Sequence, residues 1–244
     1  MYLQPKMDLE SGKLSGAEAL VRWLVGGKQI IFPDQFIPVF ERNGFCIQLD
    51  YYMMEQACKQ IRSWMDAQLS PVPISVNQTK LLFYEEDYVE RICAIAERYD
   101  VPSSFIVLEI LEGLALENPK RVSRQIRRLH DHGFRVSMDD FGSGYASLTT
   151  LSQLPIDELK LDRSFLLQAD ESTDNNRKIL EVVIEVAKRL EISTVAEGIE
   201  TADHVQMMQE MHCDYGQGYY YSKPISAEEF TKSFLEKERE TDSQ

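Results

Sequence analysis

The chain has 244 residues, of which 43% are hydrophobic and 27% are charged, so its composition is that of a folded globular protein and not of a disordered one. Its 26 lysines and arginines against 40 aspartates and glutamates give a formal net charge of −14, which disfavours nonspecific binding to a nucleic acid polymer or an anionic membrane. Four scattered cysteines without a CxxC pair indicate neither a zinc site nor a disulfide framework, and no apolar run approaches the ~18 residues of a membrane span. We therefore expect a cytoplasmic domain without a membrane segment, or the cytoplasmic part of a longer protein that could be anchored in a membrane.

The first half of the chain predicts an irregular start followed by alternating strands and helices. Its first two strands are separated by a turn and could pair as a hairpin. The run FIVLEI is almost continuously apolar, which is typical of a strand that is buried on both faces of a parallel sheet. The expected strands are residues 2–6, 14–23, 72–77 and 105–110, and the expected helices are 33–44, 47–69 and 88–99.

The second half repeats a strand-helix pattern more regularly. The helix at 176–190 has the strongest periodicity, and its expected buried face consists of Ile179, Val182, Val183, Val186, Ala187 and Leu190. The other expected helices are 121–132, 201–212 and one that starts at Ser226 through a capping box; the expected strands are 134–139, 157–161, 193–197 and 215–219. Eight strands, six of them followed by helices, predict an α/β fold, a TIM-like barrel, as a single domain over residues 1–236 with a frayed charged tail at 237–244.

The stretch RVSMDDFGSGY, residues 135–145, contains the strongest chemical signal. Asp139 and Asp140 follow a predicted strand, and two adjacent carboxylates repel each other unless a proton or a cation neutralises them. Gly142 and Gly144 give the exit loop the backbone freedom that a sharp turn needs. An aspartate-rich turn is the alternative interpretation of this stretch taken alone.

Polar residues recur at the ends of the other predicted strands. Because parallel strands of a barrel end at the same rim, this convergence predicts a site there. The residues are Glu18, Asn77, Glu109, Asp139, Asp140, Lys160, Glu197 and Gln217. Taken singly, each has a structural alternative: Glu18 or Arg22 could face solvent, and Lys160 could pair with Asp157 or Asp162.

Nine motifs occur in an order that resembles the EAL-domain cyclic-di-GMP phosphodiesterase family over nearly the whole chain. They are LQPK, EALVRW, FIPVFERNG, SVNQT, LEILE, MDDFGSGYASL, LPIDELKLDRSF, VAEGIET and DYGQGYYYSKP. The resemblance implies a TIM-like (β/α)8 barrel with an antiparallel first strand, and hydrolysis of cyclic-di-GMP to linear pGpG by a water that two metal ions activate. It leaves open a homodimer and an upstream sensory or GGDEF domain as partners.

The resemblance also implies roles for individual residues. Two Mg²⁺ or Mn²⁺ ions would be held by Glu18, Asn77, Glu109, Asp139 and Asp140, a hard-oxygen donor set that suits these ions independently of the family. The implied catalytic residues are Glu197, Lys160, Glu112 and Asp140, with Glu197 as general base. The implied substrate-binding residues are Gln4, Leu20, Arg22, Asp140 and Gln217, and the implied supporting residues are Glu112 and Glu200.

Glu112 is expected to hold the loop from Asp140 to Leu148. Strand alternation directs Glu109 and Glu112 to different sides, so Glu112 can accept a hydrogen bond from the neighbouring exit loop. Leu111 stands where the family pattern has threonine. Two other functions stay open: a catalytically weak effector domain that binds cyclic-di-GMP, and an unrelated metal-dependent barrel enzyme such as a lyase.

Overall fold

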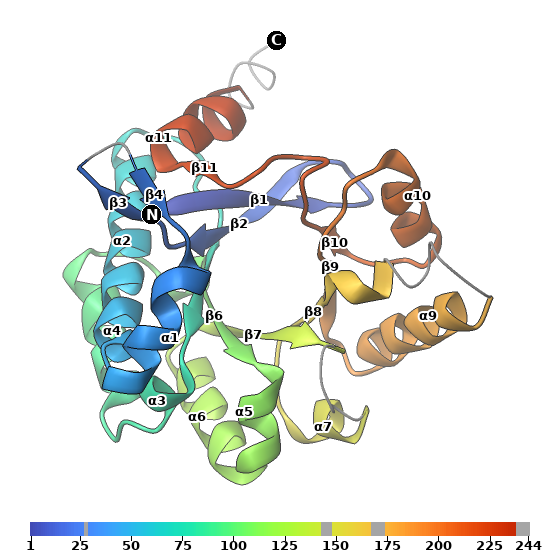
Figure 1. Ribbon diagram of the computed structural model, residues 1–244, viewed down its shortest axis with the longest axis horizontal. Helices are drawn as coiled ribbons and strands as arrows, with labels where there is room; N and C mark the ends of the chain where they lie inside the picture. Colours follow the sequence, from blue (N-terminus) through green and yellow to red (C-terminus); the bar gives the residue numbers. More distant parts are fainter. Residues whose placement is uncertain (27–28, 143–147, 167–173, 238–244) are drawn as a thin grey trace.

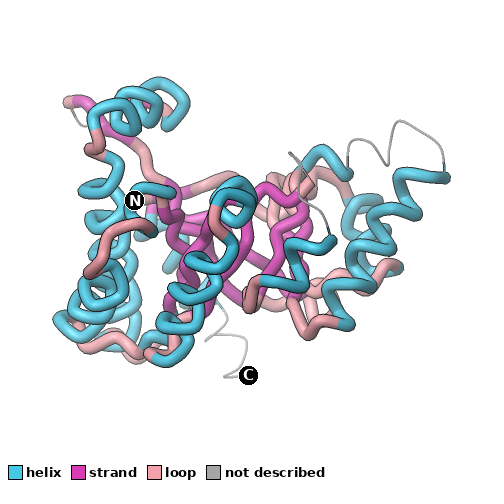
Figure 2. Tube along the Cα trace, turned by 90° about the horizontal axis from the view of Figure 1, so that it is seen from below, coloured by secondary structure: helices cyan, strands magenta, loops and turns pink. Residues whose placement is uncertain are grey.

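The computed structural model describes residues 1–26, 29–142, 148–166 and 174–237. Within these residues eight strands close into a barrel with helices around it (Figure 1), and the strands lie at the centre of the side view in Figure 2. The barrel consists of β1 (Tyr2–Asp8), β2 (Leu14–Leu20), β5 (Ile74–Gln78), β6 (Ile106–Leu111), β7 (Arg135–Phe141), β8 (Glu158–Leu161), β9 (Ser193–Ala196) and β10 (Tyr215–Gly216). β10 pairs with β1 as well as β9, and this pairing closes the barrel.

The direction of β1 distinguishes this barrel from one made only of parallel strands. β1 is antiparallel to both of its barrel neighbours, β2 and β10, whereas β2 and β5 to β10 run parallel to one another. The predicted TIM-like barrel with an antiparallel first strand is therefore confirmed. A ninth strand, β11 (Ile225–Ser226), pairs with the start of β1.

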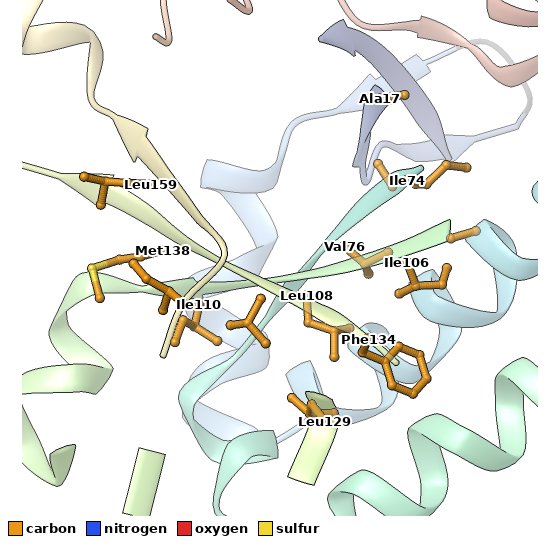
Figure 3. Close-up of a cluster of buried hydrophobic side chains, with 14 of the residues drawn as sticks. Ala17, Ile74, Val76, Ile106, Leu108, Ile110, Leu129, Phe134, Met138 and Leu159 are labelled. Atoms are coloured by element: carbon orange, nitrogen blue, oxygen red, sulfur yellow. The ribbon is translucent and has the colours of Figure 1, made fainter. Parts of the chain in front are cut away.

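Helices cover the outside of the barrel because every second side chain of its strands is apolar and points outward. Figure 3 shows Ile106, Leu108 and Ile110 of β6 in one cluster with Leu129 and Phe134, and all five are buried. The intervening position Glu109 points into the barrel instead. The helices are α1 (Pro33–Asn43), α2 (Cys46–Asp66), α3 (Lys80–Phe83), α4 (Tyr88–Arg98), α5 (Glu112–Glu117), α6 (Pro119–Asp131), α7 (Leu148–Gln153), α9 (Asp174–Arg189), α10 (Ala202–Glu210) and α11 (Ala227–Phe230).

Several expected boundaries were wrong. The second strand ends at Leu20 and not at residue 23, and Trp23–Val25 forms a separate strand β3 that pairs with β4 (Gln29–Ile31). The last barrel strand has two residues where five were expected. The short helices α3, α5 and α7 were not predicted, because four to six residues give too little periodicity to detect.

The buried face of α9 was also assigned partly wrongly. Ile179 is 55% exposed, Val182 is 50% exposed and Leu190 is 41% exposed, whereas Leu180 and Ile184 pack in the core. Of the two hydrogen bonds that make up a capping box, the last helix shows the one from the Glu229 N–H to Ser226 Oγ, at 3.2 Å. Of the expected frayed tail at 237–244, residues 238–244 lie outside the described residues.

Candidate active site

Lys160 is the centre of the polar barrel mouth. It lies on β8 with 1% of its surface exposed, and its Nζ is 2.8 Å from Glu197 Oε1. Two further carboxylates, those of Glu109 and Asp139, lie 3.0 Å away, and that of Glu18 lies 3.3 Å away. A buried ammonium requires counter-charges, and barrel closure supplies four of them from different strands. The alternative considered from the sequence, an ion pair of Lys160 with Asp157 or Asp162, does not form. Asp157 instead contacts His130 at 2.8 Å, and Asp162 accepts a hydrogen bond from the Ser164 N–H.

Glu18 connects the carboxylates around Lys160 to polar side chains of β1 and β5. Its Oε2 accepts a hydrogen bond from Gln217 Nε2 at 2.6 Å, and its Oε1 accepts one from Asn77 Nδ2 at 3.2 Å. Gln217 Nε2 also donates to Gln4 Oε1 at 3.2 Å. If Asn77 binds a metal, its ligand atom is Oδ1, at the other end of the amide from the donating Nδ2. The two ends have a similar shape, so the amide can present either one to the site. Gln4, Glu18, Asn77 and Gln217 therefore form one connected network.

Asp139 and Asp140 converge although strand alternation alone would send them to opposite faces. Asp140 adopts a left-handed conformation with φ of 57°, and the pairing of β7 with β8 shifts register between Met138 and Phe141. Such a bulge re-aims a side chain at the end of a strand. As a result, Asp139, Asp140 and Glu197 each bring a carboxylate oxygen within 4.8 Å of the others.

Burial and mutual repulsion shift the pKa values of this cluster. Burial raises the pKa of Glu109 well above its usual range, with the charges of Glu18 and Asp139 adding to it against the opposing effect of Lys160. Burial likewise raises the pKa of Glu197 to about 7. For Lys160, burial lowers the pKa, but the carboxylates outweigh it and hold the pKa well above its ordinary value.

Four carboxylates share the single Lys160 ammonium, so repulsion between the carboxylates adds to the burial that raises the pKa values of Glu109 and Glu197. A divalent cation bound among the carboxylates would reduce that repulsion. The oxygen donors of Glu18, Asn77, Glu109, Asp139 and Asp140 fit Mg²⁺ or Mn²⁺, because both prefer hard oxygen ligands and no histidine or cysteine belongs to the set. The residues present therefore fit a divalent metal site.

Glu112 holds the beginning of the loop that follows β7. This residue is 4% exposed at the start of α5, and its Oε2 accepts a hydrogen bond from the Gly142 N–H at 3.0 Å. Gly142 has a φ of 97°, and a Cβ there would lie 2.1 Å from Phe165 Cε2, so only glycine fits. Glu112 is the hydrogen-bond acceptor expected for this loop from the sequence. Residues 143–147 of the loop lie outside the described residues.

A cavity of about 240 Å³ opens beside the carboxylate cluster. Its lining includes three of the residues expected to bind substrate, namely Gln4, Leu20 and Gln217, together with Glu197. The rest of its lining is Glu18, Arg163, Gly198, Glu200, Gly218 and Tyr219. Glu200 pairs there with Arg163, at 3.5 Å between Oε1 and Nη2, and is not in contact with Lys160.

Arg22 lies apart from this cavity lining. Its Nη1 donates to the Val21 carbonyl at 2.8 Å, and its guanidinium lies 5.5 Å from the Phe32 ring centroid and 6.0 Å from that of Tyr2. Arg163 and Tyr219 of the cavity wall were not predicted as site residues. Their position in the sequence could have identified them, because Arg163 shares a motif with Lys160 and Tyr219 shares one with Gln217.

The fold and the site define a TIM-like barrel protein with a carboxylate-rich mouth. The EAL domain family matches residues 1–224, and the chain belongs to this family. It is 33% identical over 237 residues to the cyclic di-GMP phosphodiesterase NbdA of Pseudomonas aeruginosa, covering 96% of this chain and 30% of that protein. It is 30% identical to the signaling protein YkoW of Bacillus subtilis, covering 97% of this chain and 29% of that protein.

Among solved structures, the chain is similar to a complex of the PaMucR phosphodiesterase with c-di-GMP. The TM-score is 0.88 at 30% sequence identity, and the match covers 94% of this chain and 92% of that one. The chain thus spans less than half the length of the two curated relatives above. No helix in the described ranges is both long and apolar enough to cross a membrane.

Proposed function

We propose that this chain hydrolyses cyclic-di-GMP to linear pGpG. The observation that carries the proposal is the arrangement at the barrel mouth: four carboxylates around the buried Lys160, with Asp140 beside them and a cavity lined by Gln4 and Leu20. Relatives that cover nearly the whole chain include the cyclic di-GMP phosphodiesterases NbdA and PA2567 of P. aeruginosa, which supports this substrate. An effector domain without activity has no need for so many charged groups in a site that burial makes costly.

The proposed metal ligands divide between two positions. Glu18, Asn77, Glu109 and Asp139 would hold one ion, and Asp139 and Asp140 would hold the second. Bound there, Mg²⁺ or Mn²⁺ would supply positive charge that eases deprotonation of a water and stabilises the charge that develops on the phosphate oxygens.

The chain's own residues perform the remaining tasks. Glu197 accepts the proton of the attacking water while the new bond to phosphorus forms. The bond from phosphorus to one ribose oxygen breaks, and that oxygen takes up a proton from solvent and leaves as the hydroxyl of linear pGpG. Its pKa of about 7 suits a general base near neutral pH. Lys160, 2.8 Å away, orients this carboxylate. Arg22 binds a phosphate once its side chain turns from the Phe32 ring toward the cavity.

Glu112 acts through the loop and not on the substrate. Its hydrogen bond fixes Gly142, two residues after Asp140, and so keeps Asp140 directed toward Asp139 and Glu197. In the full-length protein we place this barrel in the cytoplasm, as one domain over residues 1–236 with an upstream sensory or GGDEF domain. A homodimer is its proposed assembly.

Incubation of the chain with cyclic-di-GMP and either Mg²⁺ or Mn²⁺, followed by chromatography of the nucleotides, tests the function. The expected result is linear pGpG that accumulates only when the metal is present, and that is lost in Glu109→Gln, which is nearly isosteric. Intact cyclic-di-GMP after the incubation, together with tight binding in calorimetry, would instead establish an effector domain. Neither turnover nor binding would refute both functions.

A further inference from the structure

The helix α6 carries two kinds of cation. Arg121 donates from Nη2 to the Tyr84 carbonyl at 2.7 Å and lies over the Tyr84 ring, and Arg128 pairs with Glu90 and Gln125. In contrast, Lys120, Arg124 and Arg127 have no hydrogen bond or ion pair with any described residue, and all three are exposed. They lie at positions i, i+4 and i+7, so they share one face of the helix.

This face borders a hollow between α6 and α7, two helices that are in contact with each other. The hollow has a volume of about 590 Å³. Its lining consists of Pro119, Lys120, Ser123, Arg124, Arg127 and Gln153. No described carboxylate belongs to this lining, although the chain as a whole has a net charge of −14.

Such an arrangement has a physical cost when the hollow holds no anion. Like charges at spacings of three and four residues on a helix repel each other and destabilise the helix. The other described cations of α6 avoid this cost by pairing with neighbouring elements, whereas these three face a common space. An anion placed among them would gain two guanidinium forks, one ammonium, the Ser123 hydroxyl and the Gln153 amide as donors.

We propose that this hollow is a binding site for a small phosphate-bearing molecule, separate from the barrel mouth. The seven helical steps from Lys120 to Arg127 span about 10 Å of helix, which matches two or three adjacent phosphate groups and not a long polyanion. The volume also falls in the range of about 300 to 1,000 Å³ that small-molecule sites occupy. Arginine forks recognise phosphate through two parallel hydrogen bonds, which gives selectivity over a single-point anion.

Calorimetry with inorganic pyrophosphate tests this site. The titration uses the whole chain in EDTA, so that no metal recruits the probe to the carboxylate cluster. The expected result is saturable one-to-one binding whose Kd rises at least tenfold in Arg124→Gln/Arg127→Gln. The control Arg91→Gln/Arg98→Gln changes net charge equally at two exposed α4 arginines that pair with Asp87 and Glu55, and it should leave the Kd within twofold of wild type.

Amide chemical shifts locate the binding independently of affinity. Pyrophosphate should shift Ser123 and Gln153 in wild type, and hydrolysis of cyclic-di-GMP should proceed in both double variants. Equal Kd values in the two double variants, binding that never saturates, or shifts confined to the barrel mouth would each overturn the proposal. Binding of a glutamate-rich peptide without binding of pyrophosphate would also overturn it, because the occupant would then be an acidic protein segment.

Discussion

Removal of the Glu112 carboxylate should reduce turnover without unfolding the barrel. Its Oε2 accepts the Gly142 N–H at 3.0 Å from a position that is only 4% exposed. A hydrogen bond to a charged group contributes about 1.5 to 3 kcal/mol. If that energy holds the exit loop of β7 in place, its loss shifts the loop equilibrium by about 10- to 150-fold, because every 1.4 kcal/mol is a factor of ten.

The assay is initial velocity of cyclic-di-GMP hydrolysis across a Mg²⁺ titration. For Glu112→Ala we expect kcat to fall by about 10- to 150-fold, the range of the lost hydrogen bond, and half-saturation to need more Mg²⁺. Glu112→Gln retains a neutral hydrogen-bond acceptor, so its kcat should lie between those of wild type and Glu112→Ala. Leu111→Thr is the matched neighbour: Leu111 is 48% exposed, and its replacement should leave stability unchanged.

The circular dichroism spectrum should be the same for wild type and the three variants, because neither Glu112 nor Leu111 belongs to the hydrophobic core. Near wild-type turnover of Glu112→Ala over the whole titration would refute the reasoning and show that other contacts hold the loop. A fall in turnover that follows a fall in Tm would assign Glu112 to the stability of α5.

The remaining predictions concern the base, the metal, the glycine and a buried acid. Glu197→Ala should lower the hydrolysis rate by about 10² to 10⁴ while calorimetry in Ca²⁺ shows a much smaller change in dinucleotide affinity; affinity that falls as far as the rate would refute its role as base. Saturating Ca²⁺ should support far less turnover than Mg²⁺, because Ca²⁺ prefers longer bonds of ~2.3 to 2.6 Å and more ligands, and equal rates would contradict this. Gly142→Ala should cost about 2 to 4 kcal/mol in the free energy of unfolding from overpacking and left-handed strain, whereas Gly12→Ala, with φ of 69° and open space, should cost only the strain. Burial raises the pKa of Asp50 to about 7, so the folded state binds more protons than the unfolded one, and wild-type stability relative to Asp50→Asn should fall as pH rises from about 4 to about 7 in denaturant titrations.

The sequence predicted best those elements whose side chains have one dominant environment. The run at β6 is apolar on every outward position and was placed within one residue of its bounds, Ile106–Leu111. The two-residue β10 has no comparable pattern of its own and is held by pairing with β9 and β1. Local propensity contains little information on such a strand, because its neighbours come from distant parts of the chain.

The helix α9 shows a different limit. Apolar residues occupy more than half of its circumference, so several faces satisfy the same period of 3.6. Packing against β9 selects the face with Leu180 and Ile184 and leaves Ile179 and Val182 exposed. Periodicity establishes that a helix forms here, and the neighbouring elements decide which of its stripes is buried.

The candidate site was predictable as a set of strand ends, but its geometry was not. Adjacent residues of a regular strand face opposite ways, so strand alternation would direct Asp139 and Asp140 to opposite faces. The family resemblance implied that both would hold metal, but the strand pattern gave no means for it. The left-handed Asp140 and the register shift beside it supply that means, and such a conformation is tolerated by aspartate better than by most residues. A strained residue that the fold maintains beside a charged cluster is typical of a functional site.

Lys160 connects the stability of the barrel with its chemistry. Its ammonium is shared by Glu18, Glu109, Asp139 and Glu197, which come from four other parts of the barrel wall. Removal of the Lys160 ammonium would leave four carboxylates facing one another in a buried space. The folded state would lose stability, and a fall in activity would not by itself reveal a catalytic role. A divalent metal bound at the same oxygens would compensate for the missing charge. A Lys160 variant should therefore gain more thermal stability from Mg²⁺ than the wild-type protein does, which separates its structural role from its catalytic one.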